Sequence, residues 1–128
     1  SMSPSGKSIA FAFTRTQSGN VQAGIAVIAN ESKQVVSSHP VKITIGSQYE
    51  EPTIQWSADE SEVYFIQLDN SVSNIMKLRL SDGAVSNVTN FADGRIFNFA
   101  VEPGGKRILI ARGFVERDAS LLQIDQPL

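Results

Sequence analysis

The feature that most constrains this chain is an internal repeat with a period close to 45 residues. A tight polar turn leading into a strand occurs three times, at residues 3–11, 57–65 and 102–110, and the copies begin 54 and then 45 residues apart. Residues 44–65 also align with residues 89–110 without a gap. Strands therefore keep their spacing while loops absorb changes in length, as expected where loops tolerate insertions and strands do not.

Within each repeat, apolar and polar residues alternate in short runs, which predicts strands with one buried face. No segment carries apolar residues at helical spacing for long enough to indicate a helix. Asp82-Gly83 lies between two alternating runs, and this dipeptide predicts a hairpin turn with positive φ at both central residues. The expected strands cover residues 7–13, 24–29, 41–45, 62–66, 76–80 and 84–89.

The later strands of the repeats also correspond to one another. Apolar positions align at offsets of 50 and 46 residues: Ile28 with Leu78, Val35 with Val85, Ile75 with Leu121, and Leu78 with Ile124. A period of about 45 residues with about four short strands per unit is typical of a β-propeller blade. The sequence therefore predicts an all-β fold built from four-stranded antiparallel propeller blades.

The chain is interpreted as a single propeller fragment, residues 1–128, with units at approximately 3–52, 53–95 and 96–128. The first unit lacks its inner strand and the third its outer strand. We therefore expect roughly ten strands and a partial propeller, because a closed propeller has about 4–8 blades. Residues 1–2 are interpreted as a remnant of cloning placed before a segment of a longer protein. A blade cannot bury both of its faces alone, so further chain or other copies must cover the end faces.

The turns resemble the Trp-Ser-Pro-Asp-Gly-Lys signature of the TolB-type, WD-repeat-like β-propeller family. The signature occurs in imperfect form three times: Ser3-Pro4-Ser5-Gly6-Lys7, Trp56-Ser57-Ala58-Asp59-Glu60 and Glu102-Pro103-Gly104-Gly105-Lys106. The resemblance covers nearly the whole chain and implies about three incomplete blades. It implies little about function, because the signature forms turns and packs blades.

Composition excludes several classes of function. The 11 basic and 13 acidic side chains give a net charge of -2, with no basic stripe, so we expect no nucleic-acid binding through this domain. The absence of cysteine excludes disulfides, thiolate metal sites and cysteine nucleophiles. No apolar run is long enough to cross a bilayer, so we expect no membrane insertion. No signal peptide opens the chain, and both the periplasm and the cytoplasm stay open as compartments.

The candidate chemical residues each have a structural interpretation. His39 is the only histidine, and without a Gly-x-Ser-x-Gly elbow it is interpreted as a surface loop residue. The acidic pairs Glu50-Glu51 and Asp59-Glu60 could bind calcium or act as acid and base. Because neighbouring residues on a strand point to opposite faces, neither pair is arranged to act together, and both are interpreted as solvated turns. We expect no catalytic, cofactor-binding or metal-binding residues.

The aromatic and basic residues are likewise assigned to packing and to the surface. Inter-blade core positions are expected for Trp56, Tyr64, Phe97 and Phe99. Four late arginines stand near acidic residues and predict a salt-bridged surface: Arg95, Arg107, Arg112 and Arg117, with Glu116 and Asp118. Gly104-Gly105 is interpreted as a turn, since no helix follows it to form a phosphate site.

These observations favour a non-catalytic interaction or sensor module with a protein partner. In proteins that this chain resembles, such propellers follow a bacterial kinase or a winged-helix DNA-binding regulator, or act in the periplasm with envelope partners. The resemblance thus implies part of a bacterial regulatory or envelope protein. The alternative is the gating propeller of a prolyl-oligopeptidase-like serine peptidase whose catalytic domain lies outside this chain. A third hypothesis is homo-oligomerisation through the open blade faces.

Overall fold

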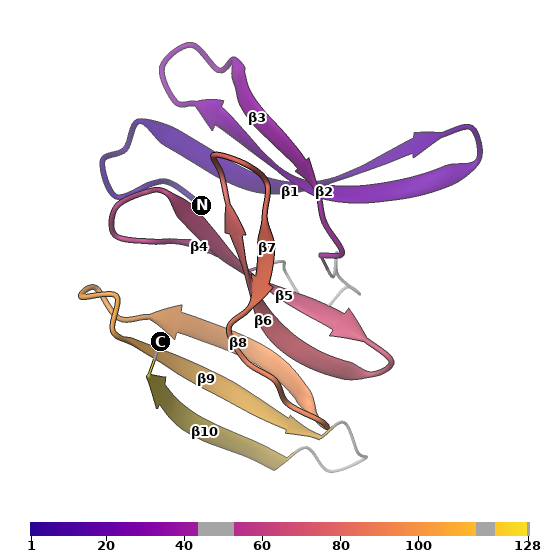
Figure 1. Cartoon of the computed structure of the whole chain (residues 1–128), viewed down its shortest axis with the longest axis vertical. Coiled ribbons are helices and arrows are strands. Elements are labelled where there is room, and N and C mark those ends of the chain that lie inside the picture. The colour runs from indigo at the N-terminus through magenta and orange to yellow at the C-terminus, as the bar shows by residue number, and fades with distance from the viewer. Residues whose placement is uncertain (44–52, 115–119, 128) are drawn as a thin grey trace.

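The computed structural model describes residues 1–43, 53–114 and 120–127, which form ten strands in three antiparallel sheets stacked face to face (Figure 1). Blade 1 contains β1 (Ser8–Gln17), β2 (Asn20–Ala29) and β3 (Val35–Pro40). Blade 2 contains β4 (Ile54–Trp56), β5 (Glu62–Asp69), β6 (Val72–Arg79) and β7 (Val85–Asn87). Blade 3 contains β8 (Arg95–Val101), β9 (Arg107–Phe114) and β10 (Ser120–Pro127).

The all-β prediction is confirmed, and in the described residues only blade 2 has the full set of four strands. Blade 1 begins with its second strand, and blade 3 ends with its third. No helix in the described part of the chain has the length and apolar character needed to cross a bilayer.

The repeat alignment is visible in the strand pairing. Met2 forms an isolated antiparallel bridge with Ile9, which matches the pairing of Trp56 with Val63 in blade 2. Ser1 and Met2 thus stand where the inner strand of blade 1 would end. The offset of 50 is also confirmed, because Ile28 lies opposite Val35 as Leu78 lies opposite Val85.

The alignment of the third blade at an offset of 46 is wrong by two residues. Ile66 lies opposite Ile75 in blade 2, and the equivalent Ala111 lies opposite Gln123 rather than Leu121. A shift of two residues preserves the alternation between the faces of a strand, so the sequence pattern could not distinguish the two registers.

The prediction of a strand at residues 41–45 is also wrong for its described part. The strand of this region is β3, which ends at Pro40, and residues 44 and 45 lie outside the described residues. Val41 donates one further hydrogen bond to the carbonyl oxygen of Ala23 at 3.2 Å, and Ile43 is buried in the core. The alternation here reflects side chains of an inter-blade connection inserted into the core.

The turns depend on left-handed backbone conformations. The three signature turns place Gly6, Glu60 and Gly105 at equivalent positions, with φ of 75°, 61° and 70°. A left-handed conformation costs a residue other than glycine about 1–2 kcal/mol. The signature has glycine at this position because the backbone there is left-handed, and Glu60 adopts the same conformation under strain.

The hairpin at Asp82-Gly83 differs from the predicted turn. Only Gly83 of the pair has positive φ, at 75°, and its N–H donates to the carbonyl oxygen of Arg79 at 2.8 Å. The loop is therefore longer than two residues. Two-residue turns with positive φ at both positions occur instead at Ser18-Gly19 and Asn70-Ser71, which the sequence pattern did not single out.

Two apolar clusters hold the blades together. We call the face of a blade that points toward the preceding blade its upstream face, and the opposite one its downstream face. In the first cluster, the upstream face of blade 2 packs on the downstream face of blade 1: Trp56, Val63, Phe65, Met76 and Leu78 against Ala10, Ile25 and Val27. In the second, blade 2 packs on blade 3: Tyr64, Ile66 and Ile75 against Ile96, Phe99, Ile108 and Ile110.

Candidate functional site

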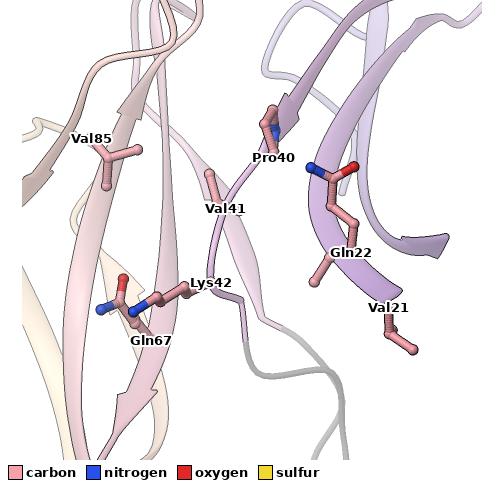
Figure 2. Close-up of a pocket in the computed structure, with 8 residues that line it drawn as sticks. Val21, Gln22, Pro40, Val41, Lys42, Gln67 and Val85 are labelled. Carbon is pink, nitrogen blue, oxygen red and sulfur yellow. The ribbon is translucent and has the colours of Figure 1, made fainter. Parts of the chain in front are cut away.

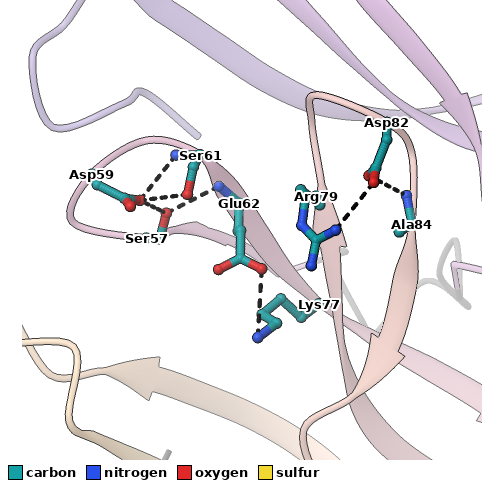
Figure 3. A network of polar contacts seen from close by, with 8 residues as sticks. All are labelled: Ser57, Asp59, Ser61, Glu62, Lys77, Arg79, Asp82 and Ala84. Atoms are coloured by element: carbon teal, nitrogen blue, oxygen red, sulfur yellow. Dashed lines mark hydrogen bonds and ion pairs between the residues drawn. The ribbon is translucent and has the colours of Figure 1, made fainter.

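In the signature turn of blade 2, the carboxylate of Asp59 is hydrogen-bonded within the turn itself (Figure 3). One carboxylate oxygen of Asp59 accepts hydrogen bonds from the hydroxyls of Ser61 at 2.7 Å and Ser57 at 2.8 Å, and from the N–H of Ser61 at 3.0 Å. These bonds, led by that from the Ser61 hydroxyl, lower the pKa of Asp59 to about 2. Ser57 in turn accepts the N–H of Glu62 at 3.0 Å. Asp59 therefore closes its own turn.

Glu60 has a different structural contact. Its carboxylate accepts the N–H of Ser5 at 2.8 Å and so joins the signature turns of blades 1 and 2. This bond lowers the pKa of Glu60. The other acidic pair, Glu50-Glu51, lies outside the described residues. In the described segments, no group of three or more His, Asp or Glu side chains could hold a metal ion.

His39 lies in a seam rather than in a surface loop, contrary to the interpretation from the sequence. It is a half-buried residue of β3 and faces the β6–β7 hairpin of blade 2. A Cβ atom added at Gly83 would lie 3.2 Å from His39 Nδ1. His39 Nε2 is buried and has no hydrogen-bond partner among the described residues, so no serine there is paired with it as in a catalytic triad.

Of the four late arginines, Arg95, Arg107 and Arg112 lie in the described residues, and Arg112 forms an ion pair with Asp93. Arg112 donates to the carbonyl oxygen of Asp93 at 2.6 Å and to its carboxylate at 3.1 Å, and its guanidinium lies 3.7 Å from the Phe91 ring centre. Arg107 is exposed, Arg95 is half-buried, and residues 116–118 lie outside the described residues. The partner of Arg112 thus comes from the connection between blades 2 and 3.

Three of the four predicted core aromatics are confirmed. Trp56, Tyr64 and Phe99 are buried in the inter-blade clusters, and the Trp56 indole N–H donates to the carbonyl oxygen of Ser1 at 3.0 Å. Phe97 is only half-buried and belongs to neither cluster. It falls in a register irregularity between Ile96 and Asn98, which removes it from the alternation that would have buried it.

The seam between blades 1 and 2 opens into a groove of about 450 Å³ (Figure 2). We call it the seam groove, and its lining comes from β2, the end of β3 with the residues that follow, β5 and β7: Val21, Gln22, Ala23, Pro40, Val41, Lys42, Gln67 and Val85. Val21 and Val85 are exposed valines on its opposite sides. Lys42 and Gln67 lie on the blade 2 side and Gln22 on the blade 1 side (Figure 2).

The groove combines three kinds of chemistry. Its valines and Pro40 offer apolar contact, Lys42 offers an ammonium group, and the two glutamine amides each offer donors and an acceptor. Sequence reasoning missed this set, because its members are spread over four segments and fit no motif. Only the stacking of two blades brings them together.

Comparison with known proteins establishes the fold. No family model and no curated protein matches the chain. TolB from Acinetobacter baumannii is 20% identical over 99% of this chain with a TM-score of 0.63. The β-propeller domain of the trilobed protease from Pyrococcus furiosus is 16% identical over 88% with a TM-score of 0.60. The acylaminoacyl peptidase from Pyrococcus horikoshii is 14% identical over 88% with a TM-score of 0.58.

The chain spans 31% of the TolB chain, 32% of the trilobed protease propeller and 16% of the acylaminoacyl peptidase. At these identities the likeness is one of fold. The resemblance to TolB-type propellers is thereby confirmed, and the chain is a partial β-propeller.

Proposed function

We propose that this chain is a non-catalytic, protein-binding part of a larger regulatory or envelope protein, and that the seam groove receives an extended segment of the partner. The observation that carries the proposal is the lining of the groove. Exposed Val21 and Val85 line the same groove as Lys42, Gln22 and Gln67. Propellers place their binding residues on loops and strand ends of a rigid scaffold, which supports the proposal.

The lining defines the chemistry of the segment. An ammonium group favours a carboxylate, and the valines favour an adjacent apolar side chain. Glutamine amides can donate to and accept from a peptide backbone at once. The expected partner segment therefore carries Asp, Glu or a C-terminal carboxylate next to an aliphatic or aromatic residue.

The walls of the groove are held by the blade cores. Val41 is tied to Ala23 by a backbone hydrogen bond of 3.2 Å, and Ile43 anchors the same connection in the first apolar cluster. A groove that needs little ordering on binding keeps more of its contact energy as affinity.

The test is selection of short peptides from a displayed random library on the purified chain. Peptides that carry a carboxylate beside an apolar residue should be enriched. By titration calorimetry, their affinity should fall more than tenfold on Lys42→Glu and stay unchanged on Lys106→Glu, an exposed lysine of the blade 3 turn. No enrichment, or equal binding by the Lys42→Glu chain, refutes the groove as the binding site.

A second candidate function is the gating propeller of a serine peptidase. Its support is that two of the similar structures are, by their names, a protease propeller and an acylaminoacyl peptidase. Sequencing of the longer gene separates the two functions. A Gly-x-Ser-x-Gly motif within an α/β-hydrolase domain supports the peptidase, whereas a kinase or DNA-binding domain supports the interaction module.

A further inference from the structure

A second hollow, of about 400 Å³, is formed by the β5–β6 hairpin, β7 and the connection from β7 to β8. We call it the polar hollow. Small-molecule sites of about 300–1,000 Å³ are usually lined by apolar side chains with a few polar groups. Here five of the eight described lining residues are polar: Gln67, Asp69, Asn70, Asn74 and Asn87. Such a lining suits a ligand that is itself polar over most of its surface.

The strand pairing explains where the hollow lies. Its strands all belong to blade 2, and Gln67 of β5 lies opposite Asn74 of β6, so the two side chains share one face of the blade. Phe65 lies on the same face, two residues before Gln67, and is buried in the first cluster. Gln67 is half-buried and Asp69 is exposed. The hollow therefore begins where blade 1 no longer covers the upstream face of blade 2.

Asn74 holds one wall of the hollow in place. Its side-chain oxygen accepts the N–H of Phe91 at 2.6 Å and the hydroxyl of Thr89 at 2.9 Å, and its amide nitrogen donates to the carbonyl oxygen of Phe91 at 3.2 Å. The Phe91 ring packs against the guanidinium of Arg112, 3.7 Å from the ring centre. The connection that carries Phe91 is thus fixed by the protein itself, without a ligand.

Other polar groups of the hollow are available to a ligand. The side chains of Gln67, Asp69 and Asn70 form no hydrogen bond with any of the residues that the structure describes. Asn87 donates to the carbonyl oxygen of Thr89 at 3.1 Å, which fixes the orientation of its amide group. Amides offer both donors and an acceptor, and a carboxylate offers acceptors alone. The hollow therefore presents donors and acceptors together.

The charge of the lining narrows the class of ligand. Asp69 is the one ionisable side chain among the eight described lining residues, so the hollow repels phosphate, sulfate and carboxylate groups. Calcium prefers about 6–8 oxygen ligands, commonly with several carboxylates, and a cation makes no use of amide donors. A sugar hydroxyl both donates and accepts, and so pairs with an amide or with a carboxylate.

We infer that the polar hollow binds a neutral sugar. Asp69 accepts hydrogen bonds from its hydroxyls, and the amides of Gln67, Asn70 and Asn87 pair with further hydroxyl groups. Phe91 supplies an apolar wall for the carbon-bound hydrogens of the sugar ring. This ligand differs in class from the peptide proposed for the seam groove, and Gln67 is the residue that lines both.

The first test is an array of immobilised glycans that includes neutral, sialylated, sulfated and amine-bearing members, probed with the purified chain. Neutral glycans should be retained, and titration calorimetry with the best of them gives its dissociation constant. No retained glycan, or a preference for the charged members, overturns the inference. Loss of binding in EDTA overturns it as well, because it would assign the contact to a metal ion.

A matched pair of variants locates the site. Asp69→Ala should raise the dissociation constant of the glycan by about tenfold, because it removes the hydrogen bonds to a charged acceptor. Glu31→Ala, which removes an exposed carboxylate from the β2–β3 turn, should leave that constant unchanged. Circular dichroism verifies that both variants stay folded. Equal binding by the Asp69→Ala chain and the unaltered chain refutes the hollow as the sugar site.

A crossed measurement separates the hollow from the seam groove. Lys42 lines the groove alone and Asp69 the hollow alone. Lys42→Glu should therefore leave glycan affinity unchanged. If Lys42→Glu weakens glycan binding as much as Asp69→Ala does, the sugar lies in the groove and the inference is overturned. The glycan result does not depend on whether peptides bind the groove.

Discussion

Ser71 offers a test of the backbone argument for the turns. It is the second residue of the two-residue turn between β5 and β6, with φ of 65° after Asn70 with φ of 48°. Positive φ at both positions defines a type I′ turn, in which Asn-Gly is the preferred sequence. Among the described residues, no hydrogen bond involves the Ser71 side chain. Ser71→Gly therefore changes the backbone preference and almost nothing else.

The magnitude follows from two opposing free energies. Relief of the left-handed conformation contributes about 1–2 kcal/mol. The extra freedom of glycine in the unfolded chain costs about 0.4–1 kcal/mol. The net expectation is that Ser71→Gly stabilises the protein by about 0.5–1 kcal/mol, and for a chain of this length that raises Tm by about 2–4 °C.

The assay is thermal unfolding followed by circular dichroism, with all variants at one protein concentration because association shifts Tm. Ser71→Ala is the matched control, since it removes the same hydroxyl but keeps the left-handed strain, and its Tm should not rise. A Tm for Ser71→Gly at or below that of the unaltered chain would refute the reasoning. An equal rise in Ser71→Ala would assign the effect to the hydroxyl instead.

Three further outcomes are expected. Gly83→Ala should lower the free energy of unfolding by about 1–2 kcal/mol in a urea titration, because φ is +75° and the new Cβ would lie 3.2 Å from His39 Nδ1. An unchanged urea midpoint contradicts this. Asn74→Ala should lower the free energy of unfolding by about 1–3 kcal/mol in the same titration, since the backbone N–H of Phe91 loses the Asn74 side-chain oxygen that accepts its hydrogen bond at 2.6 Å. Unchanged stability would contradict that role. Asp59 has a pKa of about 2 in the folded chain against a usual value of 3.8, so between these pH values the unfolded state binds more protons and stability falls as pH falls. Asp59→Asn should reduce the slope of stability against pH in this range, and an unchanged slope would exclude Asp59 as its source.

The signature turns illustrate how far local sequence reasoning extends. The signature places Gly6, Glu60 and Gly105 at equivalent positions, and all three share the left-handed conformation. This correspondence holds because the turn is determined by residues within one short segment. The same reasoning mistook the turn at Asp82-Gly83, because the dipeptide is compatible with a longer loop in which glycine alone has positive φ.

The seam groove could not be predicted from the sequence, because it depends on residues from several segments rather than from one. Lys42, Gln22 and Gln67 carry no motif and come from segments that meet only when blade 1 stacks on blade 2. His39 likewise looked like a loop residue, since its contact with Gly83 joins two blades and leaves no trace in spacing.

The sequence by itself determined most of the strands, the repeat and the propeller class of this protein, because alternation and turn chemistry act over a few residues and recur in each blade. The tertiary structure alone decided which faces are covered, that Phe65 is buried while its equivalent Phe11 is exposed, and where the groove opens. The physical reason is that burial of a blade face depends on the presence of a neighbouring blade. Equivalent residues in a repeat share their local conformation but do not share their neighbours.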